Sequence, residues 1–186
     1  MKVLAFGTSN SRHSINQSLA QYAAGLLPGA EVETLDINDY EMPIFSIERE
    51  QTLGQPDQAR AFLQRISKVD ALIVSFAEHN GNLTAAYKNL FDWSSRIDTK
   101  VYQGKPVVFL ATSPGKGGAA TALKIAVDSA PYFGADLRGS FSVPDFTNNF
   151  NSDRQDMTNT KMHAALLKVV GSLDNTMAQV DAASAV

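Results

Sequence analysis

The sequence predicts an α/β fold in which five parallel strands form one sheet with helices on both of its faces. Apolar runs of strand length recur along the chain, and the two strongest, residues 69–76 and 106–112, are continuous rather than alternating, which is typical of strands buried on both faces. Helical patterns lie between these runs, and such alternation predicts a parallel sheet. The 186 residues suffice for one domain, which we expect at residues 1–180, with a frayed Ala-rich tail at 181–186.

The individual elements follow in chain order. The first strand is predicted at residues 2–6, and the helix after it begins at Ile15, because apolar residues recur at helical spacing from there to Leu27. The pair Pro28-Gly29 ends that helix. The later predicted strands are residues 31–35, 69–76, 106–112 and 137–143, and the later predicted helices are residues 57–67, 83–96, 119–130 and 158–178.

The resulting order, βαβαβαβαβα, matches the flavodoxin-like three-layer sandwich, a doubly wound sheet with strand order 2-1-3-4-5. Ligands of such sheets bind outside the carboxyl ends of the strands, so the loops after the first, third and fourth strands are the expected site of chemistry. Two long connections, residues 36–56 and 144–157, are predicted to form lids or binding walls.

Composition excludes several classes of function. The chain has no cysteine, which excludes disulfides, thiolate metal sites and a cysteine nucleophile, and this favours a cytoplasmic protein. A net charge of -3 without a basic stripe disfavours nucleic acid as a partner. We expect neither a signal sequence nor a membrane insertion, because residues 1–6 are too short an apolar run and no stretch approaches ~20 apolar residues.

Loop 1, residues 7–16, lies between the first strand and the first helix and is rich in hydroxyl groups. Hydroxyls and free helix N-terminal amides bind phosphate, and Arg12 adds charged donors in a fork. The alternative is an ordinary helix N-cap supplied by Ser14 or Ser11. Neither a dinucleotide-binding glycine motif nor a Walker nucleotide loop is present.

Loop 2, residues 77–83, and loop 3, residues 112–118, follow the third and fourth strands. The amides of Asn80 and Asn82 offer donors and acceptors to a flat heteroaromatic ring, although Asn-Gly is also a common turn pair. The glycines of loop 3 permit close approach of a ligand, or serve the turn alone. The predicted topology brings all three loops to one crevice.

Three segments resemble the NADPH-dependent FMN reductases, a flavodoxin-like family that includes quinone, azo-dye and chromate reductases. They are residues 9–16, residues 78–81 with residues 88–93, and residues 113–118. The second resembles the signature Pro-Glu-Tyr-Asn-Gly followed by Lys-Asn-x-x-Asp-Trp, with Ala77 in place of the proline and His79 in place of the tyrosine. Loop 1 is also one residue shorter between Arg12 and Ser14 than the common family pattern.

The resemblance implies an FMN-dependent NAD(P)H oxidoreductase that works by a ping-pong cycle. Hydride passes from NADPH or NADH to FMN and then to a small acceptor such as a quinone. The implied cofactor-binding residues are Ser9, Ser11, Arg12, Ser14, Ile15, Asn16, Glu78, His79, Asn80, Gly81, Asn82, Ser113, Pro114, Gly115 and Gly118. In this scheme Ser9, Ser14 and Asn16, with the Ile15 amide, hold the phosphate. The Gly115 and Gly118 amides stabilise charge on the flavin edge.

No side chain has to be a catalytic acid or base, and no metal site is expected. His79 is either a proton donor to a reduced quinone, since its ordinary pKa of ~6.5 is near working pH, or a packing substitute for tyrosine. His13 and His163 are predicted to be surface residues. Apolar residues of the third helix, namely Leu90, Phe91 and Trp93, suggest a homodimer or homotetramer, as the resemblance also implies.

Three alternatives to a reductase stay open. The first is a flavodoxin-like electron carrier that binds FMN without oxidising NAD(P)H, although such carriers are usually more acidic. The second is a serine hydrolase, because residues 7–11 come near the motif G-x-S-x-G without its last glycine. The third is a non-catalytic interaction domain without flavin.

Overall fold

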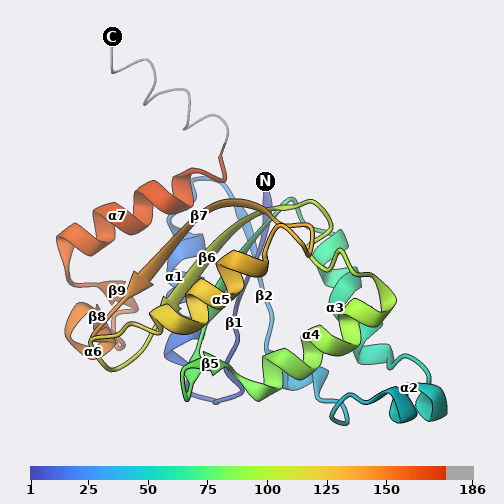
Figure 1. Cartoon of the computed structure of the whole chain (residues 1–186). Helices are drawn as coiled ribbons and strands as arrows, with labels where there is room; N and C mark the ends of the chain where they lie inside the picture. The colour runs from blue at the N-terminus through green and yellow to red at the C-terminus, as the bar shows by residue number, and fades with distance from the viewer. Residues whose placement is uncertain (175–186) are drawn as a thin grey trace.

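The computed structural model describes residues 1–174 and contains the predicted five-stranded parallel sheet (Figure 1). The strand order is β2-β1-β3-β6-β7, which is the predicted order 2-1-3-4-5. The strands are β1 (Lys2–Gly7), β2 (Glu31–Thr34), β3 (Ala71–Phe76), β6 (Pro106–Thr112) and β7 (Asp136–Val143). All four pairings within this sheet are parallel.

Helices cover both faces of the sheet and make two separate cores. The helices are α1 (Ile15–Gly25), α3 (Asp57–Ser67), α4 (Ala85–Ile97), α5 (Ala120–Ser129) and α7 (Thr160–Gly171). Successive strand residues point to opposite faces, so Leu4 and Phe6 of β1 pack with α3, α4 and α5, while Val3 and Ala5 pack with α1 and α7. Every residue of β3 is buried, which explains its continuous apolar sequence.

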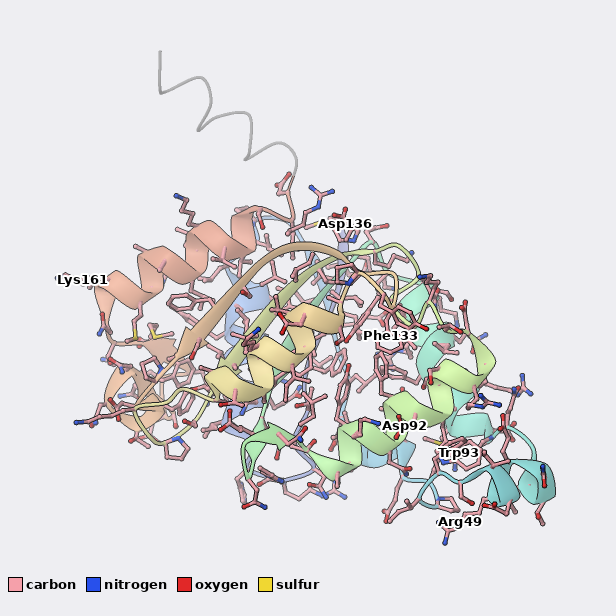
Figure 2. The ribbon with its side chains drawn as sticks, viewed as in Figure 1. Arg49, Asp92, Trp93, Phe133, Asp136 and Lys161 are labelled. Carbon is pink, nitrogen blue, oxygen red and sulfur yellow. The ribbon has the colours of Figure 1, made fainter. Side chains whose placement is uncertain are left out.

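The apolar side of the helix α4 packs into the core, while Lys88 and Arg96 on its other side are exposed. Leu90 is 2% exposed, Phe91 9% and Trp93 0%, so these three residues belong to the core of the chain, and they offer little surface for the predicted subunit contact. The Trp93 indole, whose residue is labelled in Figure 2, donates to the carbonyl of Pro43 at 2.7 Å and packs edge-on against Phe45. These contacts attach the long connection at residues 36–56 to the body of the protein.

The face of the sheet that α3, α4 and α5 cover also contains a buried pair of tyrosines. The hydroxyls of Tyr87 and Tyr102 lie 2.9 Å apart. Burial raises the pKa of both hydroxyls above the ordinary tyrosine value of 10.0, so both are neutral at physiological pH.

Short elements that the sequence analysis did not predict occupy the two long connections and loop 2. They are the 3-10 helix η1 (Ile37–Tyr40), the helices α2 (Ile47–Leu53) and α6 (Phe146–Asn149), and the strand pairs β4 (Glu78–His79) with β5 (Asn82–Leu83) and β8 (Phe150–Asn151) with β9 (Asp156–Met157). None of the described helices is long and apolar enough to cross a membrane.

The last helix is shorter than predicted. The expected span was 158–178, but α7 ends at Gly171, and Leu173 continues the apolar spacing from a turn that still packs on the core of α1 and α7. The last part of the predicted helix, residues 175–178, and the predicted frayed tail at 181–186 lie outside the described residues.

Candidate functional site at the carboxyl edge of the sheet

Loops 1, 2 and 3 leave the carboxyl ends of β1, β3 and β6, which are neighbouring strands. The crevice expected there is built on polar residues that are nevertheless buried. Among the described residues, Thr8, Asn16, Ser75, Thr84 and Thr112 are each at most 3% exposed and all lie at this edge. Buried polar groups cost free energy unless they are hydrogen-bonded, so their partners define how the loops are held.

Thr8 joins loop 1 to loop 2. Its backbone amide donates to the Ser75 carbonyl at 2.9 Å, and its hydroxyl accepts from the Ala77 amide at 2.9 Å. Its carbonyl accepts the hydroxyl of Thr84, which also caps α4 by accepting from the Tyr87 amide at 3.3 Å. The start of α4, the end of β3 and the end of β1 are thereby one hydrogen-bonded unit.

Asn16 joins loop 1 to β3 and β6 through its side chain. Its Oδ1 accepts from the Ser75 hydroxyl at 2.8 Å and from the Thr112 amide at 3.1 Å, and its Nδ2 donates to the Thr112 carbonyl at 3.0 Å. The side chain therefore points into the protein and spans three strand ends. The side chain holds the first turn of α1 in place, so the predicted binding of a phosphate by Asn16 would fall to its backbone amide and stays a prediction.

The hydroxyls of loop 1 turn the chain into α1. Ser9 Oγ accepts from the Ser11 amide at 3.1 Å, and Ser11 Oγ accepts from the His13 amide at 3.3 Å. Ser14 is the N-cap and accepts from the Gln17 amide at 3.1 Å, as the N-cap alternative predicted. This arrangement leaves the first amides of α1, including that of Ile15, at the open end of the helix.

Gly7 is required by the close approach of β1 to α1. A Cβ added there would lie 2.5 Å from the Gln17 backbone nitrogen and 2.8 Å from the Asn16 carbonyl carbon. The Gly7 amide also donates to Gln17 Oε1 at 2.7 Å. The helix N-terminus therefore sits directly on the end of the strand.

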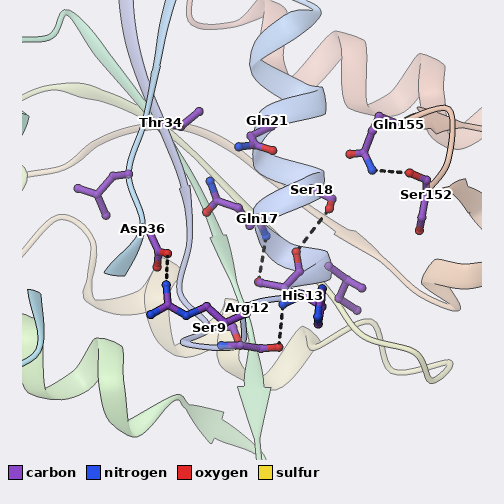
Figure 3. Close-up of a pocket in the computed structure, with 14 residues that line it drawn as sticks. Ser9, Arg12, His13, Gln17, Ser18, Gln21, Thr34, Asp36, Ser152 and Gln155 are labelled. Carbon is purple, nitrogen blue, oxygen red and sulfur yellow. Dashed lines mark hydrogen bonds and ion pairs between the residues drawn. The ribbon is translucent and has the colours of Figure 1, made fainter. Parts of the chain in front are cut away.

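A cavity of about 670 Å³ opens beside loop 1 (Figure 3). Its lining includes Ser9, Ser11, Arg12, Ser14 and Ile15, which were all predicted to bind the cofactor. His13 of loop 1 also lines the cavity. The other lining residues come from α1, from the end of β2 and from the turn between β8 and β9, and they are Gln17, Ser18, Gln21, Thr34, Leu35, Asp36, Ser152 and Gln155. Loops 2 and 3 do not line it.

The donors around this cavity suit a phosphate group. Hydroxyls, helix N-terminal amides and one guanidinium converge there. Arg12 forms an ion pair with Asp36 at 3.2 Å, and both side chains are largely exposed, so solvent weakens the pair. An anion entering the cavity therefore meets an arginine that is held in place by a modest interaction.

Loop 2 is a β-hairpin. β4 pairs with β5 through Glu78–Leu83 and His79–Asn82, and the two residues between them, Asn80 and Gly81, have φ of 53° and 71°. Positive φ at both central residues is the type I′ turn that Asn-Gly favours. His79 is exposed on this hairpin, and Asn82 Oδ1 accepts from the Leu83 amide at 2.8 Å.

The Glu78 side chain makes a contact within the protein that the sequence analysis did not predict. It was expected to bind the cofactor, but its Oε2 accepts from the Ala122 amide at 3.0 Å in the first turn of α5. The carboxylate thus links loop 2 to the helix that follows loop 3.

Loop 3 is held by its own carbonyls and by β7. The Gly115 carbonyl accepts from the Gly118 amide at 3.2 Å, from the Asp145 amide at 3.0 Å and from the Ser113 hydroxyl at 3.2 Å. The Gly118 amide is therefore engaged within the loop, and its predicted contact with a flavin stays a prediction. Pro114 lies in the exposed part of the loop, as does the Gly115 backbone.

Gly118 is needed for packing. Its φ is 58°, and an added Cβ would lie 2.3 Å from Ser142 Oγ, which donates to the Gly118 carbonyl at 2.8 Å. The glycine predicted to approach a ligand in fact approaches β7.

The remaining histidines lie apart from these loop contacts. His13 is exposed, as predicted, but His163 is half-buried, with its Nδ1 2.7 Å from the Tyr22 hydroxyl. Within residues 1–174 no group of histidine, aspartate and glutamate side chains could hold a metal ion. The hydroxyl of Ser9, the candidate hydrolase nucleophile, accepts from a backbone amide, and neither His13 nor His163 is among the recorded partners of that hydroxyl in the described part of the chain.

The sequence analysis missed Thr8, Ser75, Thr84 and Thr112 as parts of the site. Each is a small hydroxyl residue at or just beyond a strand end or before a helix, and this is the signal that could have found them. Their partners lie 31 to 96 residues away, so their roles become visible only in the fold.

Comparison with known proteins gives a consistent set of relatives. Residues 1–147 match the family model described as NADPH-dependent FMN reductase. An NAD(P)H-dependent FMN reductase of Pseudomonas aeruginosa is 34% identical over 123 residues, which cover 66% of this chain and 65% of that protein. A 2-hydroxy-1,4-benzoquinone reductase of Burkholderia sp is 33% identical over 124 residues, which cover 66% of each protein. The chain therefore spans just under two thirds of the length of these curated relatives.

Solved structures match the fold over nearly the whole chain. The flavoenzyme NAD(P)H:(acceptor) oxidoreductase of Paracoccus denitrificans superposes with a TM-score of 0.74 at 23% identity. The match covers 96% of this chain and 97% of that chain.

Proposed function

The chain belongs to the NADPH-dependent FMN reductase family, and we propose that it is an FMN-dependent oxidoreductase that uses NADPH or NADH to reduce a small acceptor such as a quinone. The observation that carries the proposal is the joining of three loops at the carboxyl edge by Thr8, Asn16 and Glu78. The names of the relatives, an FMN reductase and a benzoquinone reductase, support the same chemistry.

The residues present fit FMN at its phosphate end. The cavity at loop 1 offers the hydroxyls of Ser9, Ser11 and Ser14, the Ile15 amide and the guanidinium of Arg12. We assign these five residues to the phosphate and ribityl chain. When bound, FMN supplies the hydride chemistry that the side chains of this protein lack.

The other two loops would hold the ring end of the cofactor. The β4–β5 hairpin offers the backbone of His79, Asn80 and Gly81, and the exposed part of loop 3 offers that of Gly115. Backbone groups held rigidly at both sides orient a flat ring and exclude water from one of its faces. The second face is left to the nicotinamide and to the acceptor in turn.

The test is a visible absorption spectrum of the purified protein with FMN, recorded before and after anaerobic addition of NADPH or NADH. We expect a bound flavin that bleaches with the nucleotide and regains its colour when a benzoquinone is added. Bound flavin that stays oxidised would favour the electron carrier. Absence of any flavin binding would refute the proposal.

Other predicted properties have no direct observation behind them. A homodimer or homotetramer and a cytoplasmic location stay predictions. Among the described residues, the most exposed large apolar side chains lie outside α4 and are Ile44, Tyr132, Ile47 and Leu53, at 74%, 66%, 61% and 58% exposure. Sedimentation measurements on the purified protein would give the oligomeric state.

A further inference from the structure

The helix α5 begins without a capping side chain of its own. Its N-cap residue is Ala119, which has no oxygen to offer, is 2% exposed and has a φ of 59°. The first amides of a helix need acceptors, and a buried helix start without them is costly. By contrast, α1, α4 and α7 are capped locally by Ser14, Thr84 and Asn159.

Glu78 supplies the missing cap from 44 residues away. Ala122 is the third residue of α5, and its amide is one of those that an N-cap side chain ordinarily serves. Glu78 Oε2 accepts from that amide at 3.0 Å. A carboxylate at this end also interacts favourably with the helix dipole.

The contact between Glu78 and Ala122 lies between loop 2 and the helix that follows loop 3. Glu78 begins the β4–β5 hairpin, and β5 packs beside α5 (Figure 1). Loop 3 ends at Gly118, immediately before Ala119, and is anchored on its far side by Ser142 and Asp145. The Glu78 carboxylate thus makes a side-chain hydrogen bond from the hairpin to the first turn of α5, the helix that follows loop 3.

We propose that Glu78 is a positioning residue that sets the separation of loop 2 and loop 3 by capping α5, and so preorganises the backbone groups on both sides of the flavin ring. This inference rests on the proposed function for its ligand, but the contact itself belongs to the protein without FMN. The carboxylate acts through its acceptor oxygen at Ala122, so an amide at the same place can do the same work.

The first test is hydrogen exchange of the protein without FMN, for wild type, Glu78→Gln, Glu78→Asp and Glu78→Ala. Gln keeps an acceptor at the right distance, whereas Asp keeps the charge but withdraws the acceptor. We expect Ala and Asp to speed exchange both in the first turn of α5 and in the hairpin, and Gln to resemble wild type. Ser46→Ala removes the cap of α2, on another element, and is the matched control.

The second test is the FMN dissociation constant from flavin fluorescence. A lost cap corresponds to about a fivefold change in an equilibrium constant, so we expect Ala and Asp to weaken FMN binding about fivefold, with Gln and Ser46→Ala within twofold of wild type. If Glu78→Ala fails to fold, the Asp and Gln pair carries the test.

The proposal is overturned if Ala and Asp bind FMN as tightly as wild type, if Gln is as impaired as Ala, or if faster exchange is confined to α5. Wild type that binds no FMN would refute the proposed function instead, and the exchange data would still decide whether Glu78 couples the two loops. The two failures are therefore distinguishable.

Discussion

The two edges of the sheet are held together by different chemistry. At the amino edge, Lys2 pairs with Glu33 at 2.6 Å and Arg65 pairs with the same carboxylate at 3.1 Å, with all three side chains partly exposed. At the carboxyl edge, Asn16 and Thr8 make neutral hydrogen bonds with little or no exposure.

This difference has an energetic meaning. Exposed ion pairs contribute little because water and salt screen them, whereas a buried polar group that loses its partner keeps the full cost of its desolvation. Neutral bonds also fix direction better than mobile charged side chains. Substitutions at the amino edge should therefore cost little stability, whereas the buried hydrogen bonds at the carboxyl edge specify one arrangement of the loops. A binding site requires such a fixed arrangement.

The largest expected effect is that of Asn16→Ala. The change leaves the Ser75 hydroxyl and the Thr112 amide and carbonyl without the partner they have now, so we expect a loss of about 3 kcal/mol in the free energy of unfolding. Urea denaturation measures it. Asn10→Ala, the same change at an exposed position of loop 1, is the control and should cost less than about 0.5 kcal/mol. Equal losses of stability in Asn16→Ala and Asn10→Ala would contradict the special role of the buried hydrogen bonds at the carboxyl edge.

The next effect is that of Gly7→Ala. The added Cβ meets the backbone of α1 at 2.5 Å, so the helix start has to move, and we expect a cost of about 2 kcal/mol together with weaker FMN binding. Gly25→Ala, at the other end of α1 where a Cβ meets nothing within 4 Å, should be neutral or stabilising. Urea denaturation of both variants decides; a Gly7→Ala protein as stable as Gly25→Ala would contradict the close packing described here.

A smaller effect is expected at the amino edge for Glu33→Gln. The hydrogen bond from Lys2, with the charges of Lys2 and Arg65, lowers the Glu33 pKa below its ordinary value of 4.5. Its contribution to stability is therefore fully present above pH 4.5 and is lost as pH falls through the lowered pKa. The variant should be slightly less stable than wild type at pH 7 in low salt, with the difference vanishing in 1 M salt or at acid pH. A difference that persists under both conditions would show that the pair is not a surface interaction.

The smallest effect is expected for His79→Phe. This variant compares an exposed residue at the carboxyl edge with the buried residues there, Thr8 and Asn16. His79 is exposed and contributes its backbone to the hairpin. We expect an unchanged free energy of unfolding and quinone turnover within about twofold of wild type, since the interpretation of His79 as a substitute for tyrosine assigns it no proton transfer. Turnover that drops more than tenfold while the free energy of unfolding stays unchanged would make His79 the proton donor instead.

The buried strand β6 and the helix α3, which is buried on one side, were predictable from sequence because burial shapes their apolar patterns. Strand β6 and helix α3 have the predicted bounds, residues 106–112 and 57–67, since continuous apolar runs and helical spacing both report burial directly. The helix α7 was predicted too long because Leu173 keeps the apolar spacing after the helix has ended.

The place of the site was predictable, but the roles of several side chains were not. Strand order alone brings loops 1, 2 and 3 together. Asn16, Glu78 and Gly118 were assigned to the cofactor, yet they bond to Thr112, Ala122 and Ser142, between 24 and 96 residues away. Local sequence marks a residue as important at a loop and says nothing of its distant partner, so a support and a ligand look alike.

Hydrogen exchange of wild type with and without FMN tests the central claim most directly, because it reports on both edges in one experiment. We expect FMN to slow exchange in the three loops at the carboxyl edge, residues 9–16, 78–83 and 113–118, and to leave the amides around Glu33 and Asp70 unchanged. Protection at the amino edge, or FMN binding without protection of these loops, would contradict the account.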